Sequence, residues 1–385
     1  MEFSLTYEQR QIQESTRKMV DRDIQPVLDA HDPDTPLPKE AMRNIIQICA
    51  AQGMTSARLP ESSGGAGLSA LSYGLMMEQL PPVAALAVSV QAVTILRIDV
   101  ESTAEQRERL LPDLIAGRKI TCTATTEPDV GSDSRSVTTR VREEGDELVI
   151  NGRKMWISNG GICDVISVNG TLGKDGTGSS RMVRVIADRE QSPFETREIP
   201  TLGLRQGHLA EALFEDCRVP RNNLLGQVGD AARIMTLTWL VNRPMIGLFA
   251  VNMAQRALDA ALSYASLRTQ FGRKIGSFQL VQELLADIAT AVTTSRLLCY
   301  YALACIDNGD RANQISAMAK RFAISNCQRA ISLAMEVHGS MGISRELGLE
   351  QLYRDVRMLP IPDGTNQILT LIEGRELTGM QAYRP

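Results

Sequence analysis

The last third of the sequence contains three long stretches in which apolar side chains recur at helical spacing. They span Ile246–Leu267, Phe278–Ile306 and Ala312–Val337, and the run Asp307-Asn308-Gly309 separates the second stretch from the third. Each stretch carries an apolar stripe wide enough to pack against another helix or another subunit. The pattern therefore predicts a helical C-terminal region.

The rest of the chain divides into a second helical part and a β-rich part. Helical periodicity marks residues 5–30, 38–53, 70–79, 83–98 and 103–116, and Gly117 is placed to cap the last helix. From Lys119 the pattern changes to short β-rich runs, and Asn151-Gly152 is a strong hairpin signal. Further strands are expected near residues 165–168, 182–186 and 213–214. We predict a helical domain over 1–117, a β domain over 118–227 and a helical domain over 228–385.

Composition excludes several classes of protein. Hydrophobic residues make up 43% of the chain, charged residues 22%, and the net charge of -4 is not the basic excess of a nucleic-acid-binding protein. No unbroken apolar run reaches the ~18 residues of a membrane span. The N-terminus, MEFSLTYEQRQ, lacks the features of signal and transit peptides, so a cytoplasmic location is the default expectation.

Cysteine and histidine give no sign of a metal site. The seven cysteines are scattered without a C-x-x-C pair, which indicates neither a disulfide framework nor a zinc site, and most are expected to be buried. His31, His208 and His338 are far apart in the sequence, and His338 is expected to have a structural or surface role. We predict no metal.

Two nucleotide-binding patterns were also considered. The sequence has no GxxxxGK[ST], so a P-loop is not indicated. GAGLSA, from Gly65 to Ala70, loosely fits a dinucleotide fingerprint, but it lies between helices and does not follow a strand. We therefore do not assign it to a nucleotide.

Six segments together are more specific, and with them the chain resembles the acyl-CoA dehydrogenase family along almost its whole length. They occur in the family's order: PESSGGAGLS (Pro60 to Ser69), TEPDVGSD (Thr126 to Asp133), NGRKMWISNG (Asn151 to Gly160), RTQFGRKIGSFQLVQELLAD (Arg268 to Asp287), EVHGSMG (Glu336 to Gly342) and YRDVRMLPIPDGTNQI (Tyr353 to Ile368). The resemblance implies a mainly α fold with a central β domain: an N-terminal helical domain, a middle β-barrel-like domain and a C-terminal four-helix bundle. It also implies FAD as cofactor.

The first flavin-contacting residues implied by the resemblance lie in TEPDVGSD. Threonine hydroxyls and backbone donors in a turn can hold a flavin edge without bringing charge to it. The family's flavin-contacting threonine corresponds to Thr126, with Thr123 and Thr125 beside it. Ser132 corresponds to the serine on the pantetheine side of the thioester ligand.

A second contact with the flavin is implied in the run MWIS. Alternate residues of a strand share one face, so Trp156 and Ser158 are expected to face the same ligand. The resemblance places Trp156 against the flavin ring and the Ser158 hydroxyl near flavin N5.

The remaining FAD contacts are implied in the C-terminal third, partly across a subunit boundary. Arg268, Phe271 and Gln279 correspond to residues that bind the pyrophosphate and adenosine, and an arginine fork suits a diphosphate. Glu336 and Ser340 stand where the family usually has glutamine and glycine, against the adenosine diphosphate part of a neighbour's FAD. A carboxylate beside a diphosphate is unfavourable unless it faces ribose hydroxyls or an arginine.

The catalytic base implied by the resemblance is Asp363, in the turn Pro362-Asp363-Gly364-Thr365. The family usually has a glutamate there, preceded by an aromatic residue. The backbone N–H of Asp363 is the expected donor to the thioester oxygen, with Gly364 beside it in the catalytic turn. Thr365 and Gln367 are expected to contact the flavin.

Aspartate at this position withdraws the carboxylate by roughly 1.5 Å, and a misplacement of about 1 Å can cost about 100-fold in rate. The proline at 362 also removes bulk, which points to a substrate that is wide near Cα, such as an α-branched or alicyclic acyl-CoA. The family's alternative base position is Asn242, which cannot take up the proton, so Asp363 is the only candidate. Arg243 corresponds to an arginine that supports CoA, and it favours CoA over an acyl-carrier protein.

The function implied by these residues is α,β-dehydrogenation of an acyl-CoA thioester, with hydride transfer from Cβ to flavin N5. The expected electron acceptor is an electron-transfer flavoprotein, and the expected assembly is a homotetramer. Two alternatives stay open. The same scaffold can serve a reductase, an oxidase or an eliminating enzyme, and the loss of the usual glutamate is consistent with a catalytically silent flavin-binding subunit.

Overall fold

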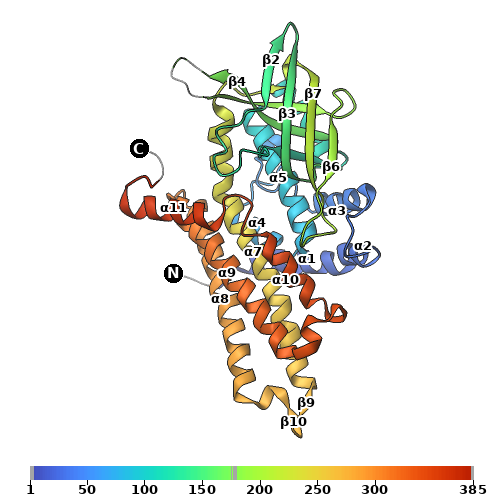
Figure 1. Ribbon diagram of the computed structural model, residues 1–385, viewed down its shortest axis with the longest axis vertical. Coiled ribbons are helices and arrows are strands. Elements are labelled where there is room, and N and C mark those ends of the chain that lie inside the picture. The colour runs from blue at the N-terminus through green and yellow to red at the C-terminus, as the bar shows by residue number, and fades with distance from the viewer. Residues whose placement is uncertain (1–3, 175, 177–179, 383–385) are drawn as a thin grey trace.

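Figure 1 shows the computed structural model, which describes residues 4–174, 176 and 180–382. The N-terminal part is helical: α1 (Tyr7–Met19), a π-helical segment η1 (Val20–Ile24), α2 (Gln25–Asp29), α3 (Lys39–Ala51), a 3-10 turn η2 (Glu61–Ser63), α4 (Ala70–Met77), α5 (Pro82–Glu101) and α6 (Ala104–Ile115). Two helices begin with capping boxes, because Thr6 and Thr103 each exchange hydrogen bonds with the glutamine three residues on. Gly117 follows α6 with φ +67, which confirms the predicted cap.

An eight-stranded sheet follows the N-terminal helices. Its strands are β1 (Thr121–Ala124), β2 (Arg140–Glu144), β3 (Glu147–Ser158), β4 (Val165–Lys174), β5 (Ser180–Asp188), β6 (Glu195–Glu198), β7 (Leu209–Pro220) and β8 (Leu224–Leu225). The order is β6-β7-β3-β2-β4-β5-β8, and β1 lies parallel to β4. Alternate side chains of β3, β4, β5 and β7 meet in one apolar core.

The predicted hairpin at Asn151-Gly152 is wrong. Strand β3 continues through both residues, and the turn between β2 and β3 is instead Gly145-Asp146, where Glu144 pairs with Glu147. Gly152 lies at a register shift between β3 and β7, and a Cβ there would stand 2.5 Å from Thr139 Oγ1. The glycine is needed for this close approach and not for a turn.

The C-terminal part is a bundle built on α7 (Asp230–Leu267), α8 (Gln279–Asp307) and α9 (Asn313–His338), with α10 (Leu349–Met358) packed on α7 and α9, and α11 (Asn366–Thr378) packed against α9 (Figure 1). The short elements are η3 (Arg221–Asn223), β9 (Thr269–Gln270), β10 (Arg273–Lys274), η4 (Ile275–Ser277), η5 (Gly339–Ile343) and η6 (Arg345–Leu347). The helices approach closely at Gly247, where a Cβ would lie 2.7 Å from Cys299 Sγ. The three predicted helical stretches are confirmed, although α7 begins 16 residues before Ile246.

Three helices are long and apolar enough, by length and composition alone, to cross a membrane: α5, α7 and α8. We expected none because we looked for an unbroken apolar run, which a window average does not require. The share of the most apolar 18-residue window that is buried within the chain is 61% for α5 and 72% for α7, but only 33% for α8. The apolar residues of α5 and α7 are therefore largely used in packing within the chain, and part of α8 is left uncovered.

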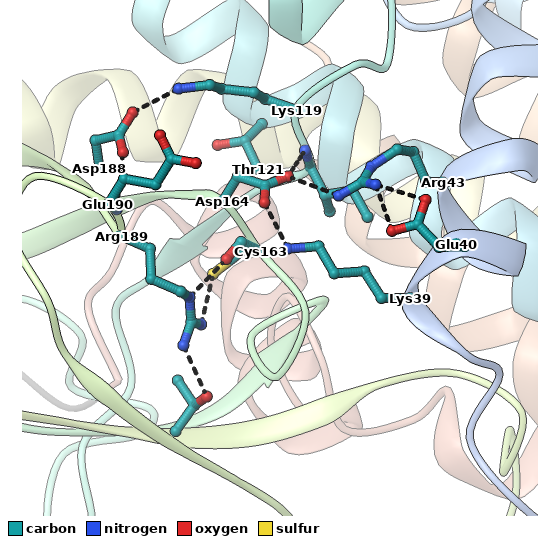
Figure 2. A network of polar contacts seen from close by, with 12 residues as sticks. Lys39, Glu40, Arg43, Lys119, Thr121, Cys163, Asp164, Asp188, Arg189 and Glu190 are labelled. Atoms are coloured by element: carbon teal, nitrogen blue, oxygen red, sulfur yellow. Dashed lines mark hydrogen bonds and ion pairs between the residues drawn. The ribbon is translucent and has the colours of Figure 1, made fainter.

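The three parts of the chain are joined by shared packing and by buried polar contacts. One apolar core includes side chains from the N-terminal helices and from the bundle. Figure 2 shows the link to the sheet, where Lys39 of α3 donates to Asp164 at 2.5 Å, and Asp164 also accepts from the Ile120 backbone at 2.8 Å. Lys119 donates to Asp188 at 2.7 Å. These partly buried contacts tie the sheet to α3 and to the segment that follows α6.

The cysteines and His338 lie as expected. All seven cysteines are buried and free. His338 is buried, its ring bonds the Ala334 carbonyl at 2.7 Å, and it stacks on Tyr264 with 4.5 Å between ring centroids. Because Tyr264 is near the end of α7 and His338 ends α9, this contact ties the two helices together at the far end of the bundle.

Candidate active site

Asp363 lies in the turn between α10 and α11, which we call the base turn (residues 362–365). Its backbone has φ +52, a conformation that non-glycine residues seldom adopt and that clusters at functional sites. The residue is half-buried. Thr365 ends the turn by capping α11, where its hydroxyl accepts from the Ile368 backbone N–H at 3.4 Å. Gln367 is exposed on the first turn of α11.

Two buried cations hold the base turn through its backbone carbonyls. Lys320 Nζ donates to the Pro362 carbonyl at 2.5 Å and to the Gly364 carbonyl at 2.6 Å. Arg243 Nε donates to the Asp363 carbonyl between them at 3.2 Å. Burial lowers the pKa of Lys320 to about 7, although Asp363 acts in the opposite direction. Three consecutive carbonyls thus have cationic donors, and Arg243 is committed to the turn at its Nε.

A third buried cation lies near enough to Asp363 to feel its charge. Arg97 of α5 donates through Nε and Nη2 to Thr238 Oγ1 of α7, at 3.0 and 2.8 Å. Burial lowers the pKa of Arg97 to about 10, and the nearby Asp363 partly offsets that shift. Asp363 therefore stands among three buried basic side chains, Arg97, Arg243 and Lys320.

The loop between β1 and β2 (residues 125–139), which we call the threonine loop, lies next to Trp156. The Met155 backbone N–H donates to the Thr126 carbonyl at 2.8 Å, which joins the loop after β1 to the end of β3. Trp156 has φ +60, and its side chain is 54% exposed although it belongs to a strand of the central sheet. The register with β7 shifts between Lys154 and Ile157, so the simple alternation used to place Trp156 and Ser158 is interrupted by a bulge. The bulge presents the indole to the outside of the sheet.

The other threonines of this region are held by neighbouring side chains. The Thr125 hydroxyl accepts from the Asn169 amide at 2.6 Å, and the Thr123 hydroxyl shares a hydrogen bond with Thr94 at 3.0 Å. Ser132 is exposed on the loop beyond them. Thr123, Thr125 and Thr126 therefore form one neutral polar cluster at the end of β1.

Beneath this cluster is a buried ion pair that we did not predict. Lys154 Nζ donates to Glu127 Oε1 at 2.7 Å and to the Thr125 carbonyl at 2.9 Å. Glu127 also accepts from the backbone and hydroxyl groups of Thr138 and Thr139, at 2.6 to 2.9 Å. Burial alone would raise the pKa of Glu127, but the bonds from Lys154 and Thr138 lower it to about 2. The pair fixes both ends of the threonine loop. The sequence feature that could have revealed this ion pair is Lys154, a charged residue at a position of β3 that faces the core.

The predicted adenosine and pyrophosphate contacts form a separate group at the other end of the bundle. Arg268, Phe271, Gln279, Glu336 and Ser340 are all exposed there, around the β9–β10 hairpin labelled in Figure 1. Phe271 is 94% exposed with φ +49, and its ring meets Phe278 edge-on at 6.2 Å. An exposed aromatic ring in a left-handed backbone is an unusual surface feature.

One chain does not bring the two groups together. Arg243, beside Asp363, lies within α7, and Arg268 directly follows the last residue of the same helix. The two arginines are 25 positions apart along it. At 1.5 Å per residue that separation is about 38 Å. The base turn and the distal group of exposed residues therefore serve one bound molecule only if another chain supplies one of them.

A cavity, which we call the inner cavity, lies between the N-terminal helices and α7. It is small, and part of its space is open to solvent. Its lining residues are Met54, Thr55, Ser56, Ala57, Arg58, Leu59, Tyr73, Ser89, Ala92, Val93, Leu96, Thr238, Val241 and Asn242. Thr238 connects the cavity to Arg97, and Asn242 precedes Arg243, so the cavity borders the surroundings of Asp363.

Three family models match this chain over nearly all of its length. They are the N-terminal domain of acyl-CoA dehydrogenase at residues 6–118, the middle domain at 122–217 and the C-terminal domain at 232–378. The chain belongs to the acyl-CoA dehydrogenase family. It is an oxidoreductase that acts on acyl-CoA thioesters, and FAD is its cofactor.

Relatives and solved structures agree with this assignment. The chain is 32% identical to "Probable acyl-CoA dehydrogenase YngJ" of Bacillus subtilis, over 98% of this chain and 100% of the relative. It is 31% identical to "Caffeyl-CoA reductase-Etf complex subunit CarC" of Acetobacterium woodii, over 86% and 89% of the two chains. The structure of butyryl-CoA dehydrogenase from Megasphaera elsdenii superimposes with a TM-score of 0.91 at 27% identity, over 98% and 100% of the chains.

The residues of this acyl-CoA dehydrogenase suit a flavin at the threonine cluster. An exposed indole beside three neutral hydroxyl groups offers a flat apolar surface and hydrogen-bonding partners without a charge, as an isoalloxazine ring requires. Trp156, Thr126 and Ser158 would hold the ring system, and Arg268 has the planar donor fork that suits a diphosphate.

Proposed function

We propose that this enzyme dehydrogenates an acyl-CoA between Cα and Cβ, with the Asp363 carboxylate accepting the α-proton. The observation that carries the proposal is the base turn itself. A carboxylate residue with a left-handed backbone is held in place by Lys320 and Arg243 through three consecutive carbonyls. Such precision of the main chain is expected where a proton must be taken from one defined position.

The chemistry requires a base, a donor to the thioester oxygen and an acceptor for the β-hydrogen. Asp363 supplies the base, and its backbone N–H points toward the carbonyl oxygen in this proposal, so that negative charge developing there is stabilised. Bound FAD supplies the hydride acceptor. Gly364, with φ +100, allows the tight turn that brings the N–H and the carboxylate to the same substrate.

The shape of the substrate follows from the shorter side chain. A carboxylate one methylene further back suits an acyl group that is broad near Cα, and Pro362 in place of an aromatic residue leaves room for it. We infer an α-branched or alicyclic acyl group. Ser132 and Arg243 would lie on the CoA side, and Asn242 would line the acyl side together with the inner cavity.

The separation of about 38 Å along α7 supports a shared cofactor site and hence an oligomer. We propose that Arg268, Phe271 and Gln279 of one subunit reach the FAD held by the threonine cluster of another, with Glu336 and Ser340 nearby. The uncovered face of α8 supplies apolar surface for such an assembly, since only 33% of its most apolar window is buried in the chain. A homotetramer remains our prediction.

The direction of the reaction depends on the electron partner. An electron-transfer flavoprotein is the proposed acceptor, because a relative is named as the subunit of a reductase–Etf complex. The same name supports the second candidate function, an acyl-CoA reductase that runs the chemistry in the opposite direction.

The test is anaerobic mixing of the holoenzyme with straight-chain, α-branched and alicyclic acyl-CoAs while flavin absorbance is followed. Bleaching by an alicyclic or branched thioester is expected. Asp363→Asn should abolish bleaching and leave ligand binding nearly intact. Asp216→Asn is the matched control, because Asp216 also has a left-handed backbone, with φ +45, but is exposed on β7. Full bleaching by Asp363→Asn would show that the base is another group.

A further inference from the structure

The inner cavity contains two polar groups that the protein does not satisfy. Arg58 Nε and the Tyr73 hydroxyl are both buried, and neither has a hydrogen-bond partner among the residues that the structure describes. Both residues line the cavity. Tyr73 is only 6% exposed, so water outside the protein does not replace the missing partner. A buried donor without a partner destabilises a protein, so two in one cavity are unexpected unless a ligand binds there.

Three other hydroxyl groups that line the cavity are satisfied. Thr55, Ser56 and Thr238 each donate to a backbone carbonyl, at 2.6, 3.2 and 3.0 Å. The remaining walls include apolar side chains such as Val93, Leu96 and Val241. The cavity is therefore an apolar chamber with a positively charged donor and a phenolic donor at one place in its wall.

The charge of Arg58 has no direct counter-ion in the described part of the chain. No ion pair or hydrogen bond joins its guanidinium to a described residue. Burial lowers the pKa of Arg58, and Tyr73 and Asp307 offset part of that shift. The Asp307 carboxylate, however, already accepts from the backbone N–H groups of Ala70 and Leu71, at 2.6 and 2.9 Å, as the cap of α4. It is not available as a close partner for Arg58.

Arg58 is half-buried as a residue, and a fully buried cation, Arg97, adds to the positive charge beside the cavity. Arg97 donates through both Nε and Nη2 to Thr238, which is itself a lining residue. The inner cavity thus has Arg58 in its wall and Arg97 behind its lining residue Thr238. A charge in surroundings of low polarity is expensive without an opposite one.

We propose that the inner cavity binds a carboxylate at the far end of the acyl group, so that the preferred substrates are CoA thioesters of dicarboxylic acids. The guanidinium of Arg58 and the hydroxyl of Tyr73 donate to the two carboxylate oxygens, and the acyl methylenes contact the apolar wall. A carboxylate satisfies both donors and supplies the missing charge, which a neutral hydroxyl or keto group does not do. This inference rests on the proposed function only in placing the acyl part of the substrate in the cavity.

The kinetic test compares a series of unbranched acyl-CoA thioesters with the matching series in which a carboxylate replaces the terminal methyl group. Holoenzyme is reduced anaerobically by each, and the ratio of kcat/KM for carboxylate-ended over methyl-ended thioesters is measured. We expect the ratio to favour the carboxylate at one chain length. Arg58→Met should lower that ratio about 10- to 100-fold, and Tyr73→Phe should lower it less. Arg17→Met, which changes an exposed arginine, is the control and should leave the ratio unchanged.

A binding test separates this inference from the proposed function. A carboxylate-ended acyl chain linked to CoA by a thioether cannot be dehydrogenated at the thioester, and its affinity for the holoenzyme is measured by calorimetry. Weaker binding to Arg58→Met than to the wild type supports the carboxylate site even if no thioester reduces the flavin. Reduction by methyl-ended thioesters, together with a ratio that Arg58→Met leaves unchanged, overturns the carboxylate site and keeps the proposed function. Equal affinity of the thioether for Arg58→Met and the wild type also overturns it.

Discussion

Replacing Lys320 by methionine tests how the base turn is held. Methionine keeps the length and apolar packing of the side chain but removes the donor to the Pro362 and Gly364 carbonyls. An acceptor left without its donor costs about 1–3 kcal/mol, and removal of a buried amine returns part of that cost. We expect Lys320→Met to lower the free energy of unfolding by about 2–4 kcal/mol at pH 8, measured by denaturant unfolding.

The effect on catalysis should be larger than a stability loss alone explains. If the turn relaxes and moves the Asp363 carboxylate by about 1 Å, the rate of flavin reduction should fall by about 100-fold at a temperature where the variant is fully folded. Lys18→Met is the control, since Lys18 is exposed and makes one solvent-screened ion pair with Glu14 on the same helix. A variant at Lys320 that loses stability but reduces its flavin at the wild-type rate would refute the positioning role.

The pH dependence gives an independent check of the same side chain. The pKa of Lys320 is lowered to about 7 in the folded protein, from about 10.4 in an unfolded chain. Between these values the unfolded state binds more protons, so this lysine makes the protein more stable as pH rises from 7 toward 10, by at most about 1.4 kcal/mol per pH unit. The deficit of Lys320→Met should therefore grow between pH 7 and pH 9. If the stability deficit of Lys320→Met stayed constant between pH 7 and pH 9, the lowered pKa of Lys320 would be contradicted.

Two further predictions concern buried carboxylates. Lys154→Met leaves Glu127 buried without its cation, so we expect the free energy of unfolding, measured by thermal unfolding, to fall by about 3–5 kcal/mol. The flavin content after purification should also fall, and adding Glu127→Gln should partly restore both. Unchanged flavin content would show that the ion pair does not support the cofactor. Burial raises the pKa of Asp355 to about 6, against a hydrogen bond from the Leu204 backbone N–H, so the folded state disfavours the charged form. The contribution of Asp355 to stability should therefore fall as pH rises from about 4 to 6. Asp355→Asn should raise the free energy of unfolding by about 1–3 kcal/mol at pH 8 and leave it unchanged at pH 4. An equal increase at both pH values would refute the raised pKa of Asp355.

Sequence patterns located the elements well where one physical signal dominated. Helical periodicity found the bodies of α8 and α9 to within one or two residues at each end, because long amphipathic helices repeat the signal many times. The Asn151-Gly152 prediction failed because a glycine has two uses in a sheet. At Gly152 the close approach of Thr139 decided the structure, and that contact is 13 positions away in the sequence.

The candidate site was only partly accessible from the sequence. Motifs led to Asp363, Thr126, Trp156 and Arg243. Lys320 and Arg97 were not predicted, and Arg243 was expected to support CoA and not the base turn. Lys320 lies on the buried stripe of α9, where a charged residue is anomalous, yet the sequence does not say which carbonyls it meets. The partners of Arg97 are likewise 141 positions away. A pattern reveals that a polar residue is buried, and only the fold reveals what satisfies it.

The way in which the base turn is fixed also bears on the missing methylene of Asp363. A shorter side chain could be compensated by a turn that moves inward or by a substrate that comes closer. Lys320 and Arg243 hold three successive carbonyls of the turn, and both cations are themselves fixed by burial in α9 and α7. Moving the turn would break all of these bonds together, at a cost well above that of any one of them. We therefore place the compensation in the substrate, and expect Asp363→Glu to hinder a broad acyl group and to favour a straight one, as the ratio of flavin reduction rates for the two would show.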